Sequence, residues 1–167
     1  DEPGGQSCHL HGGPNGFSRR FWKGEPVIRP RAQGVCFILY SDHGDQGYPG
    51  NLTAKVTYWL TEDNELIFEA AATTDAPTPV NLINHIYWNL SGDLSTTTLD
   101  HDLKIIADSY LPTNPGLIPT GKRNPVKGTP LDFTQHTAVG ERINDDFPAL
   151  RTGNGYDHCW VLRESPE

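Results

Sequence analysis

The chain has 167 residues and a formal net charge of −8, from 21 acidic and 13 basic residues. This acidic balance argues against nucleic acid as a partner, because backbone phosphates would be repelled. No apolar run approaches the ~20 residues of a membrane helix, so no membrane partner is expected either. Its 17 glycines and 14 prolines separate short alternating segments, which predicts one turn-rich β-domain over residues 1–167.

The first half of the chain contains a clear hairpin pattern. Residues 35–40 are apolar and predict a buried strand, and residues 41–50 predict a loop. Residues 51–60 alternate between apolar and polar side chains, residues 61–64 are typical of a turn, and residues 65–73 alternate again. The alternation at period two therefore predicts two strands that pair through a tight turn.

The rest of the chain is more irregular. After a proline-broken connection, residues 80–90 predict a strand with polar side chains where a core would need apolar ones, which indicates a strand along a wet cleft. Further elements are predicted as strands over residues 103–107, 109–112 and 156–162, an irregular stretch over 112–132, and a helical turn over 137–143. This order predicts an all-β fold, an antiparallel β-sandwich or a barrel-like fold.

The segment Asn84 to Asn89 combines side chains suited to a neutral polar substrate. His85 offers an imidazole, which exchanges protons near neutral pH as acid or base. Tyr87 and Trp88 offer flat faces that can stack on sugar rings, and the amides of Asn84 and Asn89 can read hydroxyl groups. The alternative, a surface histidine on a solvent-exposed strand, stays open at this point.

Two further motifs carry chemistry-bearing side chains. His11 precedes Gly12 and Gly13, which permit close backbone approach, although the same pattern is typical of a plain turn. Asp157 lies before an apolar stretch, where it either binds hydroxyls, orients His158, or only starts a strand. His9 and His11 have a spacing that can chelate a metal, but without further placed ligands no metal site is predicted.

These motifs, together with others, resemble the central portion of the aldose 1-epimerase family, also called galactose mutarotases. The resemblance implies an incomplete antiparallel β-sandwich of the galactose-mutarotase type. It also implies a cofactor-free isomerase that interconverts the α and β anomers of free aldoses such as galactose and glucose. The matching motifs occur in family order at residues 10–13, 47–52, 78–92, 117–121, 125–133 and 155–158.

Carried over by position, the resemblance implies roles for individual side chains. His85 resembles the general acid at the ring oxygen, His11 the second active-site histidine, and Asp157 the carboxylate that binds sugar hydroxyls. We expect these three to line one cleft, with Asn84, Tyr87 and Trp88 as further substrate-binding residues. The site predicted on this basis contains catalytic His85 and His11, substrate-binding Asp157, Asn84, Tyr87 and Trp88, and no metal.

The catalytic base of the family is a glutamate in a late strand, beyond the aspartate motif. Glu164 has the right chemistry but a different context, and the chain ends at Glu167. The base and the other absent segments are therefore expected from elsewhere in a parent chain. Two alternatives stay open: a non-catalytic carbohydrate-binding or regulatory module that lost its base, and a structural β-domain of a larger carbohydrate-active protein.

The sequence gives two opposing indications of location. Three cysteines without metal-ligand or disulfide spacing favour a reducing compartment, and the resemblance suggests the cytoplasm. Two glycosylation sequons, at Asn51 and Asn89, point the other way but are discounted, because such triplets often arise by chance. A secreted protein stays the alternative, since the resemblance implies that secreted members of such families also occur.

Overall fold

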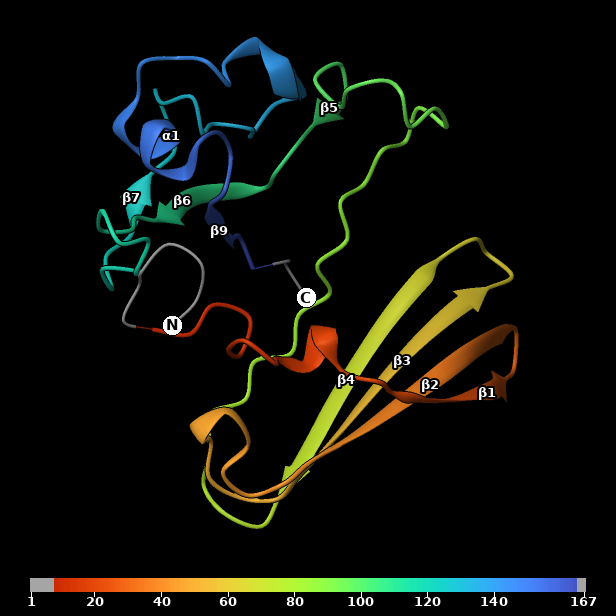
Figure 1. The fold of residues 1–167 in the computed structure, drawn as a ribbon. Coiled ribbons are helices and arrows are strands. Elements are labelled where there is room, and N and C mark those ends of the chain that lie inside the picture. Colours follow the sequence, from red (N-terminus) through yellow and green to blue (C-terminus); the bar gives the residue numbers. More distant parts are fainter. Residues whose placement is uncertain (1–7, 165–167) are drawn as a thin grey trace. The chain divides into compact units, whose positions relative to one another are not determined.

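The computed structural model describes residues 8–164, which fall into two compact units. We call the part up to His85 unit 1 and the part from Ile86 onward unit 2. All strand pairs between named strands are antiparallel in the described part of the chain, and the helices are short (Figure 1). None of these helices is long and apolar enough to cross a bilayer. The single domain expected over residues 1–167 stays a prediction.

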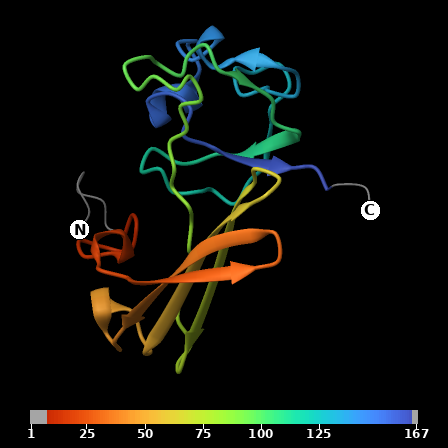
Figure 2. The same ribbon diagram turned by 90° about the vertical axis from the view of Figure 1, so that its right-hand side faces the viewer.

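Unit 1 is built on one four-stranded sheet in the order β1-β2-β3-β4, and Figure 2 shows the strands side by side. The predicted strands and hairpin turn are confirmed, with the Asn64 N–H donating to the Thr61 carbonyl at 3.1 Å. A strand that the sequence did not predict contains Pro26, which an edge position tolerates. The elements are η1 (Phe17–Arg19), β1 (Lys23–Arg29), β2 (Ala32–Ser41), η2 (Asp45–Gly47), β3 (Leu52–Thr61) and β4 (Leu66–Thr74).

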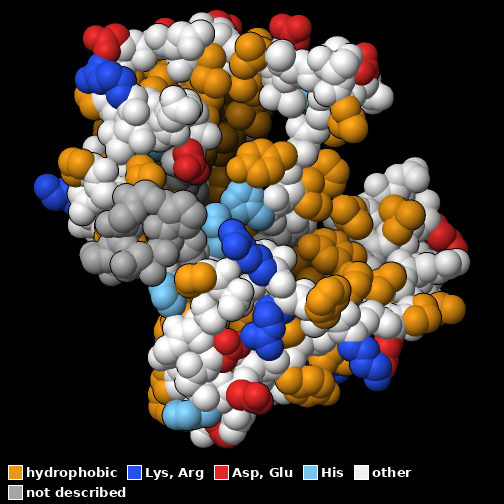
Figure 3. Space-filling view, viewed as in Figure 1, with side chains coloured by type: hydrophobic (Ala, Val, Ile, Leu, Met, Phe, Trp, Pro, Cys, Tyr) orange, Lys and Arg blue, Asp and Glu red, His pale blue; other side chains and the backbone are white. Residues whose placement is uncertain are grey.

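The two faces of this sheet differ in polarity. Directly opposite residues share a face, and the pair Phe37 and Val56 marks the apolar one. On the other face Glu69 accepts hydrogen bonds from the Arg29 guanidinium at 2.8 Å and from the Trp59 indole at 2.9 Å. Figure 3 shows many apolar side chains at the surface over β1 to β4. The alternation read from the sequence therefore corresponds to two chemically distinct faces.

One end of the apolar face is covered by segments from both ends of unit 1. Leu39, Leu52 and Ala54 are buried there, and Phe17, Trp22 and Leu82 pack against them. The Trp22 indole N–H donates to the Phe17 carbonyl at 2.9 Å, which fixes the first of these segments. This small core brings residues far apart in the sequence to the same end of the sheet.

The strand predicted over residues 80–90 is wrong. In the described part of the chain, residues 77–89 belong to no helix or strand. A mixture of apolar, aromatic and polar side chains is compatible with an extended backbone, but a strand also needs a neighbouring strand to pair with. This segment instead runs across the boundary between the units at His85, and it starts with Pro77 and Pro79, which lack an N–H.

Unit 2 contains two small sheets, β5-β8 and β7-β6-β9, and more irregular chain than unit 1. Tyr110, Val126, Leu131 and Leu150 form its buried core. The elements are β5 (Asp102–Leu103), β6 (Ala107–Leu111), β7 (Asn124–Pro125), β8 (Thr137–Ala138), η3 (Val139–Glu141), α1 (Pro148–Gly153) and β9 (Cys159–Leu162).

Three expectations for unit 2 need correction. The strand over 103–107 is two strands, because the Ile105 N–H donates to the Phe133 carbonyl at 2.7 Å and turns the chain between β5 and β6. The last strand begins at Cys159 rather than at residue 156. Helix α1 was missed because it is only six residues long, although Pro148 at its start and a left-handed residue at its end are typical helix boundaries.

Candidate active site

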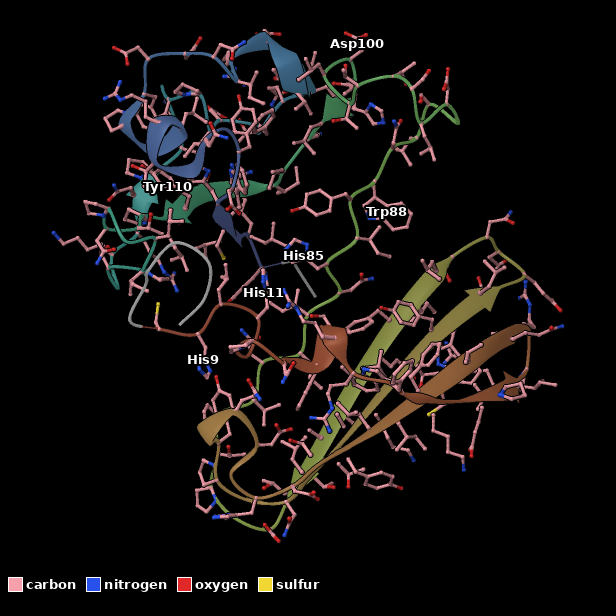
Figure 4. The ribbon with its side chains drawn as sticks, viewed as in Figure 1. His9, His11, His85, Trp88, Asp100 and Tyr110 are labelled. Atoms are coloured by element: carbon pink, nitrogen blue, oxygen red, sulfur yellow. The ribbon has the colours of Figure 1, made fainter. Side chains whose placement is uncertain are left out.

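The packing of unit 1 brings His11 and His85 together. Phe17 lies shortly after His11 and Leu82 shortly before His85, and both pack on the same buried cluster. The two imidazole rings meet edge to face, with centroids 5.4 Å apart and an interplanar angle of 71° (Figure 4). Both side chains are exposed. Two histidines at this distance, open to solvent, can both reach a small bound molecule.

The backbone at His11 is unusual. His11, Gly12 and Gly13 have consecutive positive φ values of 60°, 85° and 96°. A positive φ is uncommon for a residue with a side chain, and such conformations persist only where the surroundings impose them. The local conformation therefore depends on the contacts made by the rest of this loop.

The loop around His11 is held by the segment that contains η2. The Asn15 N–H donates to Gln46 Oε1 at 3.1 Å, and His9 Nδ1 lies 3.0 Å from the Tyr48 hydroxyl in a hydrogen bond. A Cβ placed on Gly13 would lie 2.8 Å from Gln46 Oε1 and 3.1 Å from His9 Cε1. Glycine is thus the residue that lets these side chains approach the backbone.

His9 and His11 face different partners, Tyr48 and His85 respectively. Within residues 8–164, no group of three or more histidine, cysteine or acidic side chains is close enough together to hold a metal ion. Neither Gln46 nor Tyr48 was a candidate in the sequence analysis. Both lie in a stretch that reads as a loop, and only the tertiary structure places them against the His11 loop.

Asp45 anchors the η2 segment. Its carboxylate accepts hydrogen bonds from the Ser41 hydroxyl at 2.8 Å and from the Arg20 guanidinium at 2.6 Å. These bonds, first from Ser41 and then from Arg20 and Gln46, hold the pKa of Asp45 below its ordinary value, although burial opposes the shift. The ionised carboxylate is therefore the form that stabilises this segment.

This predicts how stability depends on pH. Because the pKa of Asp45 is lower in the folded state, its contribution is fully present above the unfolded pKa and is lost as the pH falls through the folded pKa. We expect Asp45→Asn to lower the free energy of unfolding at neutral pH and to flatten its decline below about pH 4. Urea unfolding measured from neutral pH to below about pH 4 tests this prediction, and substitution of the exposed Asp42 by asparagine is the control. Parallel curves of unfolding free energy against pH for Asp45→Asn and the unsubstituted protein would contradict the prediction.

The remaining predicted side chains of the central segment differ in exposure. Asn84 is half-buried, whereas Tyr87 and Trp88 have exposed fractions of 88% and 58%. Asn89 belongs to the loop that follows it, where its amide donates to the Thr96 carbonyl at 3.1 Å and its Oδ1 accepts from the Ser91 hydroxyl at 2.7 Å. Tyr87 and Trp88 thus present aromatic surface, and Asn89 shapes the loop.

In unit 2, Asp157 lies in the connection between α1 and β9, with its side chain exposed. Its neighbours are fixed in the unit's core. The Tyr156 hydroxyl donates to the Pro130 carbonyl at 3.2 Å, and the Trp160 indole donates to the Leu131 carbonyl at 2.9 Å. Asp157 is thus an exposed carboxylate on a well-anchored backbone. The expectation that it lines one cleft with His11 and His85 stays a prediction.

Comparison with known proteins identifies close relatives. The family model described as aldose 1-epimerase matches residues 2–166. The chain is 44% identical over 155 residues to an aldose 1-epimerase of Escherichia coli, covering 92% of this chain and 43% of the relative. It is 41% identical over 158 residues to a human galactose mutarotase, covering 95% and 43% respectively. The chain therefore spans less than half the length of these relatives.

Solved structures agree on the fold. A galactose 1-epimerase from Lactobacillus acidophilus superposes with a TM-score of 0.86 at 31% identity, covering 95% of this chain and 46% of that one. An aldose epimerase homologue from C. elegans gives a TM-score of 0.73 at 30% identity, covering 94% and 46%. The predicted all-β, galactose-mutarotase-like fold with antiparallel sheets is confirmed.

Proposed function

Because the chain belongs to the aldose 1-epimerase family, we propose that it is part of an enzyme that interconverts the α and β anomers of free aldoses. Its proposed substrates are monosaccharides such as galactose and glucose. The observation that most strongly supports this is the edge-on pair of exposed imidazoles of His11 and His85. The reaction needs proton transfer at two oxygens of a small polar ring, and imidazole is suited to such transfers near neutral pH.

The proposed reaction proceeds by ring opening and closure. A base takes the proton of the anomeric hydroxyl while an acid protonates the ring oxygen, so the bond between the ring oxygen and C1 breaks and an aldehyde forms. Rotation about the C1–C2 bond presents the other face of the aldehyde. The hydroxyl that formed from the ring oxygen then attacks C1, while both proton transfers run in reverse. The enzyme is left unchanged, and no cofactor is needed.

We assign the acid role at the ring oxygen to His85, which lies on the segment that resembles the family most extensively. His11, at 5.4 Å between ring centroids, is the second histidine that hydrogen-bonds the sugar. Asp157 binds sugar hydroxyls through its exposed carboxylate. Asn84 offers a further amide to the substrate, and Tyr87 and Trp88 offer aromatic faces.

The base is proposed to be a glutamate of the parent protein outside this chain, as the family resemblance implies. The chain matches only 43% of the length of its relatives, which supports contributions from further segments. The two other candidates from the sequence make different predictions. A binding module retains sugar affinity without catalysis, and a structural domain retains neither.

Polarimetry separates these possibilities. We expect the protein at its natural length to accelerate the change in optical rotation of freshly dissolved α-D-galactose and α-D-glucose above the spontaneous rate. Calorimetric titration with the same sugars accompanies the kinetics. Sugar binding without acceleration would replace the enzyme by the binding module, and absence of both would favour the structural domain. An intact mass measurement on the same sample establishes which length was assayed.

A further inference from the structure

The residue after Asp157, His158, is half-buried in unit 2. The His158 ring lies edge to face against Tyr110 of β6, with centroids 5.9 Å apart, and against Trp160 of β9, at 6.0 Å. The end of α1 closes a further side, since a Cβ placed on Gly153 would lie 3.3 Å from His158 Cε1. Two strands and a helix thus fix the orientation of this ring.

One hydrogen bond determines the tautomer of the His158 ring. The backbone N–H of Asp157 donates to His158 Nδ1 at 3.1 Å, so Nδ1 carries no proton. A neutral imidazole has a single ring proton, which is then on Nε2. The neutral imidazole with its proton on Nε2 can therefore accept the Asp157 N–H, and neither the imidazolium nor the other tautomer can.

The surroundings favour this neutral form. Burial is the largest influence and lowers the pKa of His158, while the Ala149 carbonyl and the charge of Asp157 act in the opposite direction with smaller effect. The ring is therefore more strongly neutral near pH 7 than a solvated histidine.

We propose that His158 is a positioning residue, which holds the backbone of Asp157 so that its exposed carboxylate keeps the orientation needed to bind sugar hydroxyls. The ring links this backbone to β6 through Tyr110 and to β9 through Trp160, and it lies against the end of α1 at Gly153. Asp157 itself lies outside any helix or strand, so no regular hydrogen-bond pattern fixes its backbone. A hydrogen bond to an immobilised ring restricts the backbone at this position. This inference rests on the proposed function, because it takes Asp157 as the sugar-binding carboxylate.

Two substitutions separate positioning from packing. In His158→Asn the side-chain oxygen is near the place of Nδ1 and can accept the Asp157 N–H. In His158→Gln the longer side chain carries its amide to near the place of Nε2, so its oxygen does not replace Nδ1. Both variants lose the ring packing against Tyr110 and Trp160, so their unfolding free energies serve as the matched control.

In the protein at its natural length, we expect His158→Gln to raise the KM for galactose about 10- to 100-fold. This is the usual effect when a ligand loses a hydrogen bond to a charged group, here the bond from a sugar hydroxyl to the Asp157 carboxylate. The KM of His158→Asn stays within about threefold of the unsubstituted protein, and kcat falls less than KM rises in His158→Gln. Equal KM values in the two variants would overturn the proposal. If the unsubstituted protein does not accelerate mutarotation, the proposed function fails instead.

Nitrogen NMR of the unsubstituted protein provides a test that does not depend on variant folding. With ¹⁵N-labelled histidine, the long-range proton–nitrogen spectrum of His158 distinguishes the Nε2–H tautomer from the Nδ1–H tautomer and from the imidazolium. We expect the Nε2–H pattern at pH 7, and its retention when galactose is added. Finding Nδ1 protonated in the folded protein would overturn the proposal, whatever the activity.

Discussion

In the protein at its natural length, we expect the replacement of His85 by alanine to lower the rate of aldose mutarotation by about 10²- to 10⁴-fold, the range typical for removal of a general acid. The physical reason is that the ring oxygen is a poor leaving group until it receives a proton. Without the imidazole, water must supply that proton from no fixed position. Polarimetry with freshly dissolved α-D-galactose measures the rate, and the free sugar's spontaneous mutarotation gives the baseline.

The matched control for this experiment is His136→Ala. His136 is an exposed histidine that pairs with Asp102 across 2.9 Å, and it lies outside the motifs assigned to the site. Its removal should leave the rate unchanged within about twofold. Because His85 is exposed, its removal should also change the free energy of unfolding by less than about 1 kcal/mol. A His85→Ala protein with near-normal turnover would remove this residue from the mechanism.

We expect the replacement of Gly13 by alanine to lower turnover by up to about 10²-fold, because it misplaces His11. A methyl group at this position meets Gln46 Oε1 at 2.8 Å, so either that side chain or the loop has to move. Gln46 cannot move freely, because it accepts the Asn15 N–H. The positive φ of 96° adds a conformational cost of about 1–3 kcal/mol for a residue with a side chain.

Gly12→Ala provides the control that isolates crowding from backbone strain. Gly12 also has a positive φ, of 85°, but a Cβ there meets only Gly16 Cα, at an ordinary 3.6 Å. We expect both variants to lose stability in urea unfolding, and Gly13→Ala to lose about 1 kcal/mol more, together with most of its activity. Equal turnover in the two variants would mean that the contact with Gln46 and His9 does not position His11.

The pattern of apolar, polar and turn residues predicted those strands that pair with a strand close by in the sequence. The two strands of the 51–73 hairpin and the turn at 61–64 pair with each other, so alternation and turn residues were sufficient. A strand was also predicted over residues 80–90, yet none forms there. An extended chain becomes a strand only beside another, and the sequence does not say which neighbour is available.

The candidate residues could be selected from the sequence because their side-chain chemistry and their motifs are local properties. His11, His85 and Asp157 were selected in this way, and so was the family, which the comparisons show. Their catalytic roles stay predictions. The supporting residues were not selected as site residues. Gln46 lies in no motif, and although Tyr48 and His158 lie in matching motifs, nothing local shows what their side chains contact.

By itself, the sequence determined the all-β class, the central hairpin, and the family to which the chain belongs. Only the tertiary structure decided that His11 meets His85, that η2 holds the His11 loop, and that the His158 ring accepts the Asp157 N–H. The physical reason is that each of these contacts depends on how segments that are distant in the sequence pack together, which no local pattern records. The cluster around Leu39 aligns the two histidines, and the core around Tyr110 orients His158.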